Sequence, residues 1–514
     1  MSASRPLLIL ALVLFAVLGL GPLLAMLPRI EAADWAQLGQ TRVLSLLGRT
    51  AGLGLSVALL ATLIGLPFGF LVARTDLPGA AAWRTLSVAP LLIPTLIQAM
   101  TWVVFVEWRG APATAWILGI SYFPLVSLFA ARAFERIDRR LEEAARIARG
   151  PRGVLRADLG LVWPAVAAGA CLAFAFAIND FGVPDYVSSV GRKFNVYADE
   201  IFANWNQVKR PGLAVVTALP LVLLSLAVLW PVLRLRRQGA LASLSSAFEP
   251  PERLALGPWR WPALLFVLLV VGLSTGLPLG RLIYEAGGKQ AFSLGQLADS
   301  LRTALERARP DLLRSLGYAA GAAALAVPLG LVLGHAIERA PRRLGRALEL
   351  LCALPVLAPA TLFGIGVIVL WSRPGLAEIY HSDAMPVMVY AGRLMAFCVL
   401  ILSGAVASLD PDLEAAGALS GAGPMRRLVA LVAPPIWPTL LASGFLVFAF
   451  ALRELDTSIL VPAANRTAIL RVYNGVHFSR DSYVAGLSLI LIFTILAPGL
   501  LWALLARKRL EVLP

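Results

Sequence analysis

The chain has 514 residues, of which 59% are hydrophobic and only 15% are charged. Soluble globular domains are about 45–50% apolar and about 25% charged, so this composition excludes a soluble protein and is typical of a membrane protein. The formal net charge of +15 does not indicate a nucleic-acid partner. Most basic residues lie in short loops between apolar runs, where they set the orientation of membrane spans.

Apolar runs of about twenty residues, long enough to cross a bilayer, recur along the whole chain. The first run is too long for the apolar core of a signal peptide, so we interpret it as an uncleaved span. The sequence therefore predicts an all-α polytopic membrane protein with about twelve transmembrane helices, at 7–27, 51–73, 86–107, 112–130, 161–180, 211–233, 261–282, 315–334, 348–371, 386–406, 435–453 and 484–505.

Two polar inserts interrupt this apolar pattern, at 131–160 and 407–434. An arrangement with both termini in the cytoplasm places more arginine and lysine on the inner side, above all in the first insert. Both inserts are then cytoplasmic.

Short motifs repeat in order between the two halves of the chain. Glu143-Ala144-Ala145 and Gly150 match Glu414-Ala415-Ala416 and Gly421 at an offset of 271. Upstream, "APLLIPTL" matches "LPVLAPATL" and "GLPFGF" matches "AVPLGL". The sequence predicts two parallel six-helix halves, 1–233 and 261–514, joined by a cytoplasmic linker at 234–260.

Each insert is expected to form a small helix–turn–helix on the inner face of the membrane. Gly150-Pro151 and Gly421 to Pro424 end the first helix of each, and a second short helix begins near 154 in the first insert. An amphipathic helix resting on lipid headgroups is the alternative. A paired docking surface for a cytoplasmic protein explains better why two inserts of different charge occupy matching positions.

"EEAARIARG…WP" and "LEAAGALSG…APP" resemble the EAA loops of permease subunits of binding-protein-dependent ABC importers. The resemblance extends over nearly the whole chain, and the fused twelve-span layout is similar to ferric-iron and thiamine permeases. The glycine of each motif falls one place later than is usual in the family, and Trp163 stands where leucine commonly precedes the proline.

The resemblance implies a bacterial inner-membrane permease with three kinds of partner: two copies of a cytoplasmic ATPase subunit, a solute-binding protein on the outer face, and the lipid bilayer. It also implies that the ATPase docks in the EAA loops 131–160 and 407–434. The expected coupling residues are Glu143, Ala144, Ala145, Gly150, Glu414, Ala415, Ala416 and Gly421.

The chain itself carries no motif for chemistry. A P-loop needs a lysine after glycine and before Ser or Thr, and the one lysine that follows glycine, Lys289, precedes Gln290. We expect no catalytic residue, no metal site and no cofactor, with ATP used by the partner subunits. The histidines His335, His381 and His477 are isolated, and the three cysteines lie within apolar runs as core residues.

Charged residues in or at the ends of spans are candidates for the translocation path. Asp180 ends "FAFAIND" and Arg453-Glu454 end "FAFALRE", so the acids are expected to face each other across the pseudo-twofold axis. Ordinary interfacial charge is an equally good interpretation of them. Arg393, within the tenth span, is the other candidate. Outer loops with Tyr186, Trp205, Tyr473 and Phe478 are the expected platform for a solute-binding protein.

The stretches "NDFGVPDYV" and "ELDTSILVP" are most similar to the ferric-iron branch of the family. Thiamine, polyamine and phosphonate importers remain open as alternatives. A gradient-driven twelve-helix secondary transporter is the competing class of function, but it would place charges deeper in several spans and would not need paired polar inserts.

Overall fold

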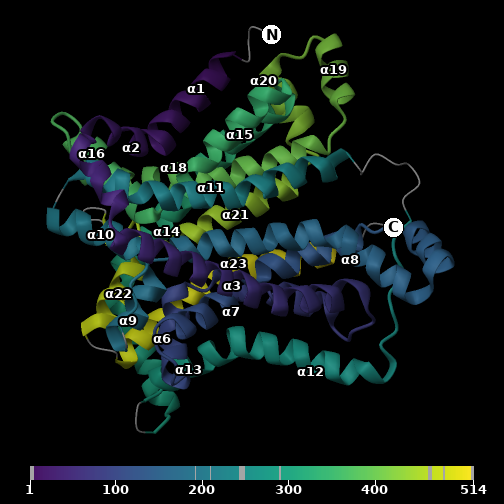
Figure 1. The fold of residues 1–514 in the computed structure, drawn as a ribbon, viewed down its shortest axis with the longest axis horizontal. Coiled ribbons are helices and arrows are strands. Elements are labelled where there is room, and N and C mark those ends of the chain that lie inside the picture. The colour runs from purple at the N-terminus through teal and green to yellow at the C-terminus, as the bar shows by residue number, and fades with distance from the viewer. Residues whose placement is uncertain are drawn as a thin grey trace.

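The computed structural model describes residues 5–191, 193–208, 210–241, 249–288, 291–460, 466–478 and 481–510. Almost every described segment is helical, and most of the long helices run roughly along one direction (Figure 1). The main elements of the first half are α1 (Arg5–Phe15), α2 (Gly21–Leu24), α3 (Thr41–Arg74), α4 (Ala80–Leu86), α5 (Ala89–Leu92), α6 (Thr95–Phe105), α7 (Ala111–Glu135), α8 (Arg139–Asn179), α9 (Gly182–Val190), α10 (Tyr197–Val208) and α11 (Pro211–Leu241).

The second half repeats this order. Its elements are α12 (Arg260–Val271), α13 (Leu277–Ala286), α14 (Leu294–Arg339), α15 (Arg342–Leu357), α16 (Ala360–Trp371), α17 (Ala377–His381), α18 (Ala384–Ala407), α19 (Pro411–Leu419), α20 (Pro424–Arg427), α21 (Trp437–Arg453), α22 (Ala468–Phe478) and α23 (Ser482–Leu510). The all-α polytopic class is confirmed. The predicted domain limits stay a prediction, and residues 242–248 of the predicted linker lie outside the described residues.

Nine helical runs in the described part of the chain are long and apolar enough to span a membrane, and three further pairs qualify only as bent units. The expected spans at 86–107 and 348–371 are each bent within the run, by 95° between α5 and α6 and by 95° between α15 and α16. The expected span at 435–453 corresponds to α21, and a 92° bend precedes it. At the first two bends, Ile93 and Ala358 are extended. Each precedes a proline, which disfavours helical backbone in the residue before it.

The core of each half is a pair of closely packed helices, α3 on α7 and α14 on α18. Close approach requires glycine at matching positions of the two pairs. A Cβ on Gly69 would meet the backbone of α7, and a Cβ on Gly330 would meet Cys398 of α18. The repeat detected around Pro67 and Pro328 thus corresponds to a repeated helix contact.

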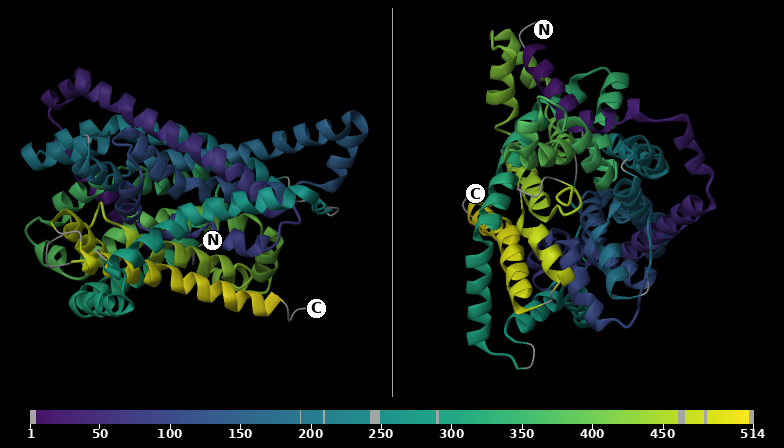
Figure 2. Two further views of the ribbon diagram at one scale, coloured as in Figure 1. Left: turned by 90° about the horizontal axis from the view of Figure 1, so that it is seen from below. Right: turned by 90° about the vertical axis from the view of Figure 1, so that its left-hand side faces the viewer.

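The first span of each half packs on the opposite half. A π-helical turn, Ala16–Leu20, links α1 to α2, and this span lies against α14, α16 and α18. Gly366 and Gly392 accommodate it, because a Cβ on either would overlap the carbonyl of Pro22 or Leu18. In the second half a π-helical turn, Gly272–Gly276, joins α12 to α13. Here α12 lies against α3 and α4 of the first half, whereas α13 lies against α6 of the first half and α14 and α23 of its own. The two halves are thus interlocked as well as adjacent, and Figure 2 (right) shows the purple start of the chain, at the N label, beside green helices of the second half.

Candidate functional site

The first insert is the beginning of α8. Asp138 caps the helix by accepting a hydrogen bond from the backbone N–H of Arg140 (3.0 Å). The helix breaks at Gly150, whose φ of 64° and ψ of −162° lie in a region that is essentially restricted to glycine. The expected second short helix is not a separate element: Arg152 already begins the span that continues to Asn179.

The second insert has the same design but is separated from its span by a bend. Asp410 caps α19 by accepting a hydrogen bond from the N–H of Asp412 (2.9 Å), and the helix ends before Gly421, at φ 76°. The short α20 then leads through a π-helical turn, Leu428–Val432, and the sharp bend into α21. Figure 1 shows both insert helices toward the right of the molecule, whereas α9, α10, α16 and α22 gather at the left.

A glutamate, buried in the first insert and partly buried in the second, anchors each insert to the last residues of the second span of its half. Glu142 binds Arg74, the final residue of α3, at 2.6 Å, and both side chains are less than a tenth exposed. Glu414 binds Arg339, the final residue of α14, at 2.8 Å, and His335 at 2.7 Å. Burial alone would raise the pKa of Glu414, but the hydrogen bonds and positive charge of His335 and Arg339 lower it below its usual value.

These contacts align the two inserts one residue differently from the sequence motif. The motif pairs Glu143 with Glu414, but the structure places Glu142 in the position of Glu414. Glu143 is instead half exposed and forms an ion pair with Arg139, one turn earlier, at 2.8 Å. The helix of the first insert is longer, so the spacing from glutamate to glycine did not reveal this shift.

Counted from the capping aspartates, the two inserts present the same exposed apolar residues. Leu141 corresponds to Leu413, and both are exposed. Ile147 corresponds to Leu419, and these side chains are 88% and 92% exposed. Single exposed aliphatic side chains are common, but their recurrence at equivalent positions of the two inserts makes these residues candidates for a contact surface.

The small residues of the predicted coupling set line the inserts but contact little. Ala144, Ala415 and Ala416 are exposed, and Ala145 is half buried. A Cβ added to Gly150 or Gly421 would meet no atom within 4 Å. Within the chain, glycine is therefore required at these two positions by the positive φ and not by crowding.

The predicted path residues lie in two networks, one in each half. Asp180 follows α8 and accepts hydrogen bonds from Thr95 (2.9 Å), Tyr122 (3.1 Å) and the N–H of Val183 (3.0 Å). In the second half, Arg393 donates a hydrogen bond to Glu454 at 2.7 Å, within a pair that is about a tenth exposed. Charge in the low-dielectric interior is therefore paired or hydrogen-bonded at both places, as it must be.

Two residues connect these networks across the halves. Arg453 donates a hydrogen bond to the carbonyl of Leu91. Asp456, which sequence reasoning missed, accepts a hydrogen bond from the N–H of Phe181 and lies within electrostatic reach of both Asp180 and Glu454. The two acids predicted to face each other thus belong to one charged cluster, with a third acid between the halves.

An aromatic cluster lies at the same interface. Phe176 and Phe450 are equivalent residues of the repeated "FAFA" stretches, and their ring centroids are 6.1 Å apart in an edge-on contact. Phe397 packs against both rings, and Tyr122 stacks on Phe176 at 5.5 Å. The sequence signal for these rings is the repeat of "FAFA" in both halves, from which only the terminal acids were predicted as site residues.

The expected aromatic platform is only partly available. Tyr186 is 2% exposed and so cannot lie on a surface, and Trp205 and Tyr473 are half buried. The side chain of Phe478 lies outside the described residues. Tyr473 donates a hydrogen bond to Asp185 of the other half at 3.0 Å, and His477 lies 3.6 Å from the same carboxylate. The aromatics therefore serve contacts between the halves.

His335 is likewise not isolated, as its contact with Glu414 shows. In the described part of the chain, no three His, Cys, Asp or Glu side chains come together in a way that could hold a metal ion.

Comparison with known families decides what these repeated elements are. The family model described as "Binding-protein-dependent transport system inner membrane component" matches twice, at residues 65–238 and 326–510. The chain belongs to this family. It is a fused permease with two copies of the family domain. Each copy contains one insert but leaves out the first span of its half, and the first copy contains one bent pair of helices whereas the second contains two.

Relatives of this permease are named for different cargoes. An Fe(3+)-transport system permease protein, FbpB 2, of Haemophilus influenzae is 23% identical over 456 residues, which are 86% of each chain. A molybdate/tungstate transport system permease protein, WtpB, of Thermococcus kodakarensis is 30% identical over 176 residues, which are 32% of this chain and 70% of that protein. The molybdenum transport system permease protein ModB of Escherichia coli is 29% identical over 165 residues, 27% of this chain and 71% of its own.

Proposed function

We propose that this permease is the membrane-spanning subunit of an ATP-driven importer of the bacterial inner membrane, with both termini and both inserts in the cytoplasm. Two copies of a separate ATPase subunit dock on the inserts, and a solute-binding protein delivers cargo to the opposite face. The chain contains no P-loop sequence, so the energy comes from the partner. The observation that carries this proposal is the repeated pair of exposed apolar residues, Ile147 and Leu419, each on a helix that a glutamate anchors through an ion pair.

The anchoring supplies a route for coupling. Each insert is fixed to its half at two points: the ion pair at the end of α3 or α14, and the covalent continuation into the span Arg152–Asn179 or into α21. A force on the insert is therefore transmitted to two spans of that half. Closure of the paired ATPases would move the two inserts together, and the interface that holds Phe176, Phe450 and the charged cluster would open to one side of the membrane.

Docking is tested by affinity capture of the tagged chain from its native membranes in mild detergent. Wild type should capture an ATPase that contains a P-loop, and Ile147→Glu with Leu419→Glu should abolish the capture, because two charges would enter an apolar contact. Phe292→Glu, at an exposed apolar residue before α14, is the matched control and should capture normally. If the double variant captured the ATPase as well as wild type does, the inserts would not be its docking sites.

For the cargo we propose ferric iron. The iron permease of Haemophilus influenzae corresponds to this chain along 86% of both lengths, whereas the molybdate and tungstate permeases correspond to about a third of it or less. The charged cluster between the halves holds three acids, Asp180, Glu454 and Asp456, with the two arginines Arg393 and Arg453. An excess of carboxylates suits a cationic cargo better than an oxyanion.

Molybdate or tungstate is the second candidate, because the identity to those permeases is higher over the shorter match. Uptake of radioactive iron and radioactive molybdate should be compared in cells that possess or lack the chain. Loss of iron uptake alone supports the proposal. Loss of molybdate uptake alone would contradict the proposal and show that the cargo is the oxyanion.

A further inference from the structure

The segment that joins the halves lies on the first insert. We name residues 249–260 the strap. Its later part is anchored on the loop after α3: Leu254 and the chain at Thr75 form an isolated parallel bridge, with the N–H of Leu254 donating to the carbonyl of Arg74 at 2.7 Å. Asp76 accepts a hydrogen bond from the N–H of Leu256 (2.9 Å) and pairs with Arg260 (2.5 Å), and both contacts lower the pKa of Asp76.

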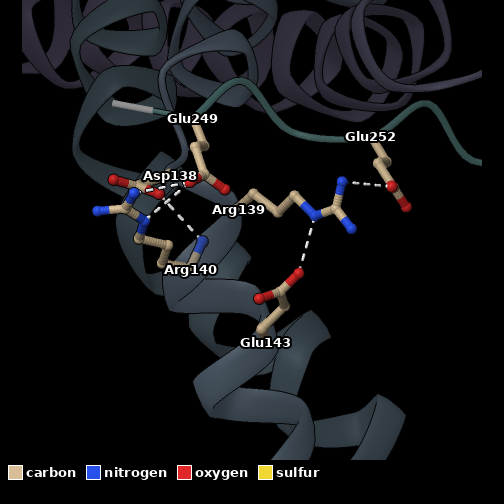
Figure 3. Close-up of polar contacts among 6 residues, drawn as sticks. All are labelled: Asp138, Arg139, Arg140, Glu143, Glu249 and Glu252. Carbon is tan, nitrogen blue, oxygen red and sulfur yellow. Dashed lines mark hydrogen bonds and ion pairs between the residues drawn. The ribbon is translucent and has the colours of Figure 1, made fainter. Parts of the chain in front are cut away.

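The earlier part of the strap covers two arginines at the start of the first insert (Figure 3). Glu249 pairs with Arg140 at 2.7 Å, and its carbonyl accepts a hydrogen bond from the N–H of Arg139 at 3.1 Å. Glu252 pairs with Arg139 at 2.5 Å. These side chains are between 42% and 67% exposed, so the carboxylates remain at the surface of the insert.

The second insert has a different charge at the same place. Counted from the capping aspartate, Arg139 and Arg140 correspond to Pro411 and Asp412. The second insert therefore begins with acid where the first begins with base. The apolar residues at the equivalent positions are nevertheless the same in kind, as Ile147 and Leu419 show.

Two copies of one ATPase would present the same surface to both inserts, and a surface that complements an acidic helix start would gain little from a neutral one. The strap removes this difference. Asp138 and Glu143 balance the charges of Arg139 and Arg140, so the helix start alone is close to neutral. Glu249 and Glu252 outweigh Arg253, and Arg260, the other base of the strap, is paired with Asp76. With the strap in place, both helix starts are net negative.

We propose that the strap is part of the first docking surface: its two glutamates make the first insert electrostatically equivalent to the second, so that both accept the same ATPase subunit. This inference rests on the proposed function. The partner that fits is a protein with an apolar depression for Ile147 or Leu419, bordered by basic side chains that face the helix start.

The test compares the two inserts in two otherwise identical variants of the chain. Ile147→Cys and Leu419→Cys are made separately, with the native cysteines replaced, and each is labelled with a maleimide photocrosslinker. The partner is the P-loop ATPase captured by the wild-type chain, held below saturation. Glu249→Gln with Glu252→Gln should lower crosslinking at position 147 roughly threefold or more, the scale of two exposed ion pairs, and leave position 419 unchanged. Glu107→Gln with Glu378→Gln, at two exposed glutamates away from the strap, is the control and should change neither.

A second variant separates charge from a loss of folding in the strap. Adding Arg139→Gln and Arg140→Gln to the strap substitutions removes the base that the glutamates offset, so crosslinking at 147 should recover. No change at 147, an equal fall at both positions, a rise at 147 or no recovery in the fourfold variant would each overturn the inference. If neither position crosslinks in otherwise wild-type protein, the proposed function itself fails.

Discussion

Glu142 and Glu143 are neighbours, but one pairs with a buried arginine and the other with an exposed arginine. Glu142 neutralises an arginine that is 3% exposed, whereas Glu143 belongs to an exposed pair on the helix surface. Removing one partner of a buried pair leaves an uncompensated charge and costs about 3–5 kcal/mol, whereas exposed pairs contribute about 1 kcal/mol or less.

We therefore expect Glu142→Ala to lower the melting temperature of the purified chain strongly and Glu143→Ala to change it little. The comparison is well matched, because both substitutions are on the same helix turn and replace the same side chain. Thermal unfolding in detergent measures the effect without any partner. Equal losses in the two variants would contradict the register in which Glu142, and not Glu143, is the counterpart of Glu414.

Gly150 gives a second prediction at the scale of a residue. Its backbone conformation disfavours any side chain at a cost of about 1–3 kcal/mol, and no atom lies near the position of a Cβ. Gly150→Ala and Gly150→Leu should therefore weaken the insert equally, and Gly150→Asn should not rescue it. Protease resistance of the insert in the purified chain reports this. A harmless alanine and a harmful leucine would show instead that a partner approaches the glycine closely.

At the scale of elements, the sequence predicts which segments are apolar better than it predicts their shape. The run 86–107 has the composition of a span, but the chain bends by 95° at Pro94, and the preceding Ile93 is extended. The matched prolines of the two halves were visible in the sequence, yet proline inside α3 and α14 leaves those helices continuous. Only the packing around each proline distinguishes the two outcomes.

The inserts show a similar limit. The repeat of Glu-Ala-Ala and glycine located both helices correctly, but the first is longer between its cap and its glycine. The contact with Arg74 decides the register, and that contact joins residues 68 positions apart in the sequence. Spacing within the motif carries no information about it.

The element α10 should respond to pH through Asp199. Burial, assisted by the nearby charges of Asp185 and Glu200 and opposed by the Val196 N–H and Lys193, raises the pKa of Asp199 to about 7. Because the folded form holds its proton more tightly than the unfolded chain, this group favours the fold at low pH, and the benefit is lost as pH rises from about 4 to about 7.

Amide exchange in α10, corrected for intrinsic rates, should therefore show greater protection at pH 5 than at pH 8. Asp199→Asn should remove most of this difference. Protection that increases with pH, or a dependence that persists in the variant, would contradict the assignment.

At the scale of the whole molecule, the exchanged first spans join the halves. Composition cannot predict this arrangement, because every span is apolar and its composition does not specify which helices it packs against. The signal lies in Gly366 and Gly392, where only glycine permits the backbone of the first span to approach.

Expressed as separate chains, residues 1–241 and 249–514 should associate and purify together. Gly366→Leu with Gly392→Leu should reduce the recovered complex roughly tenfold, since each overpacked contact costs about 1–3 kcal/mol. Gly280→Leu, at a glycine with no atom near its added Cβ, is the control. Undiminished association in the double variant would show that the exchanged spans do not hold the halves together.

The most direct test of the whole account is transport by the purified chain in liposomes, with and without the captured ATPase, under ATP or under an imposed ion gradient. We predict cargo accumulation only with the ATPase, ATP and the solute-binding protein, and no effect of collapsing the gradient. Accumulation driven by the gradient in liposomes that contain this chain alone would contradict the account and identify a secondary transporter.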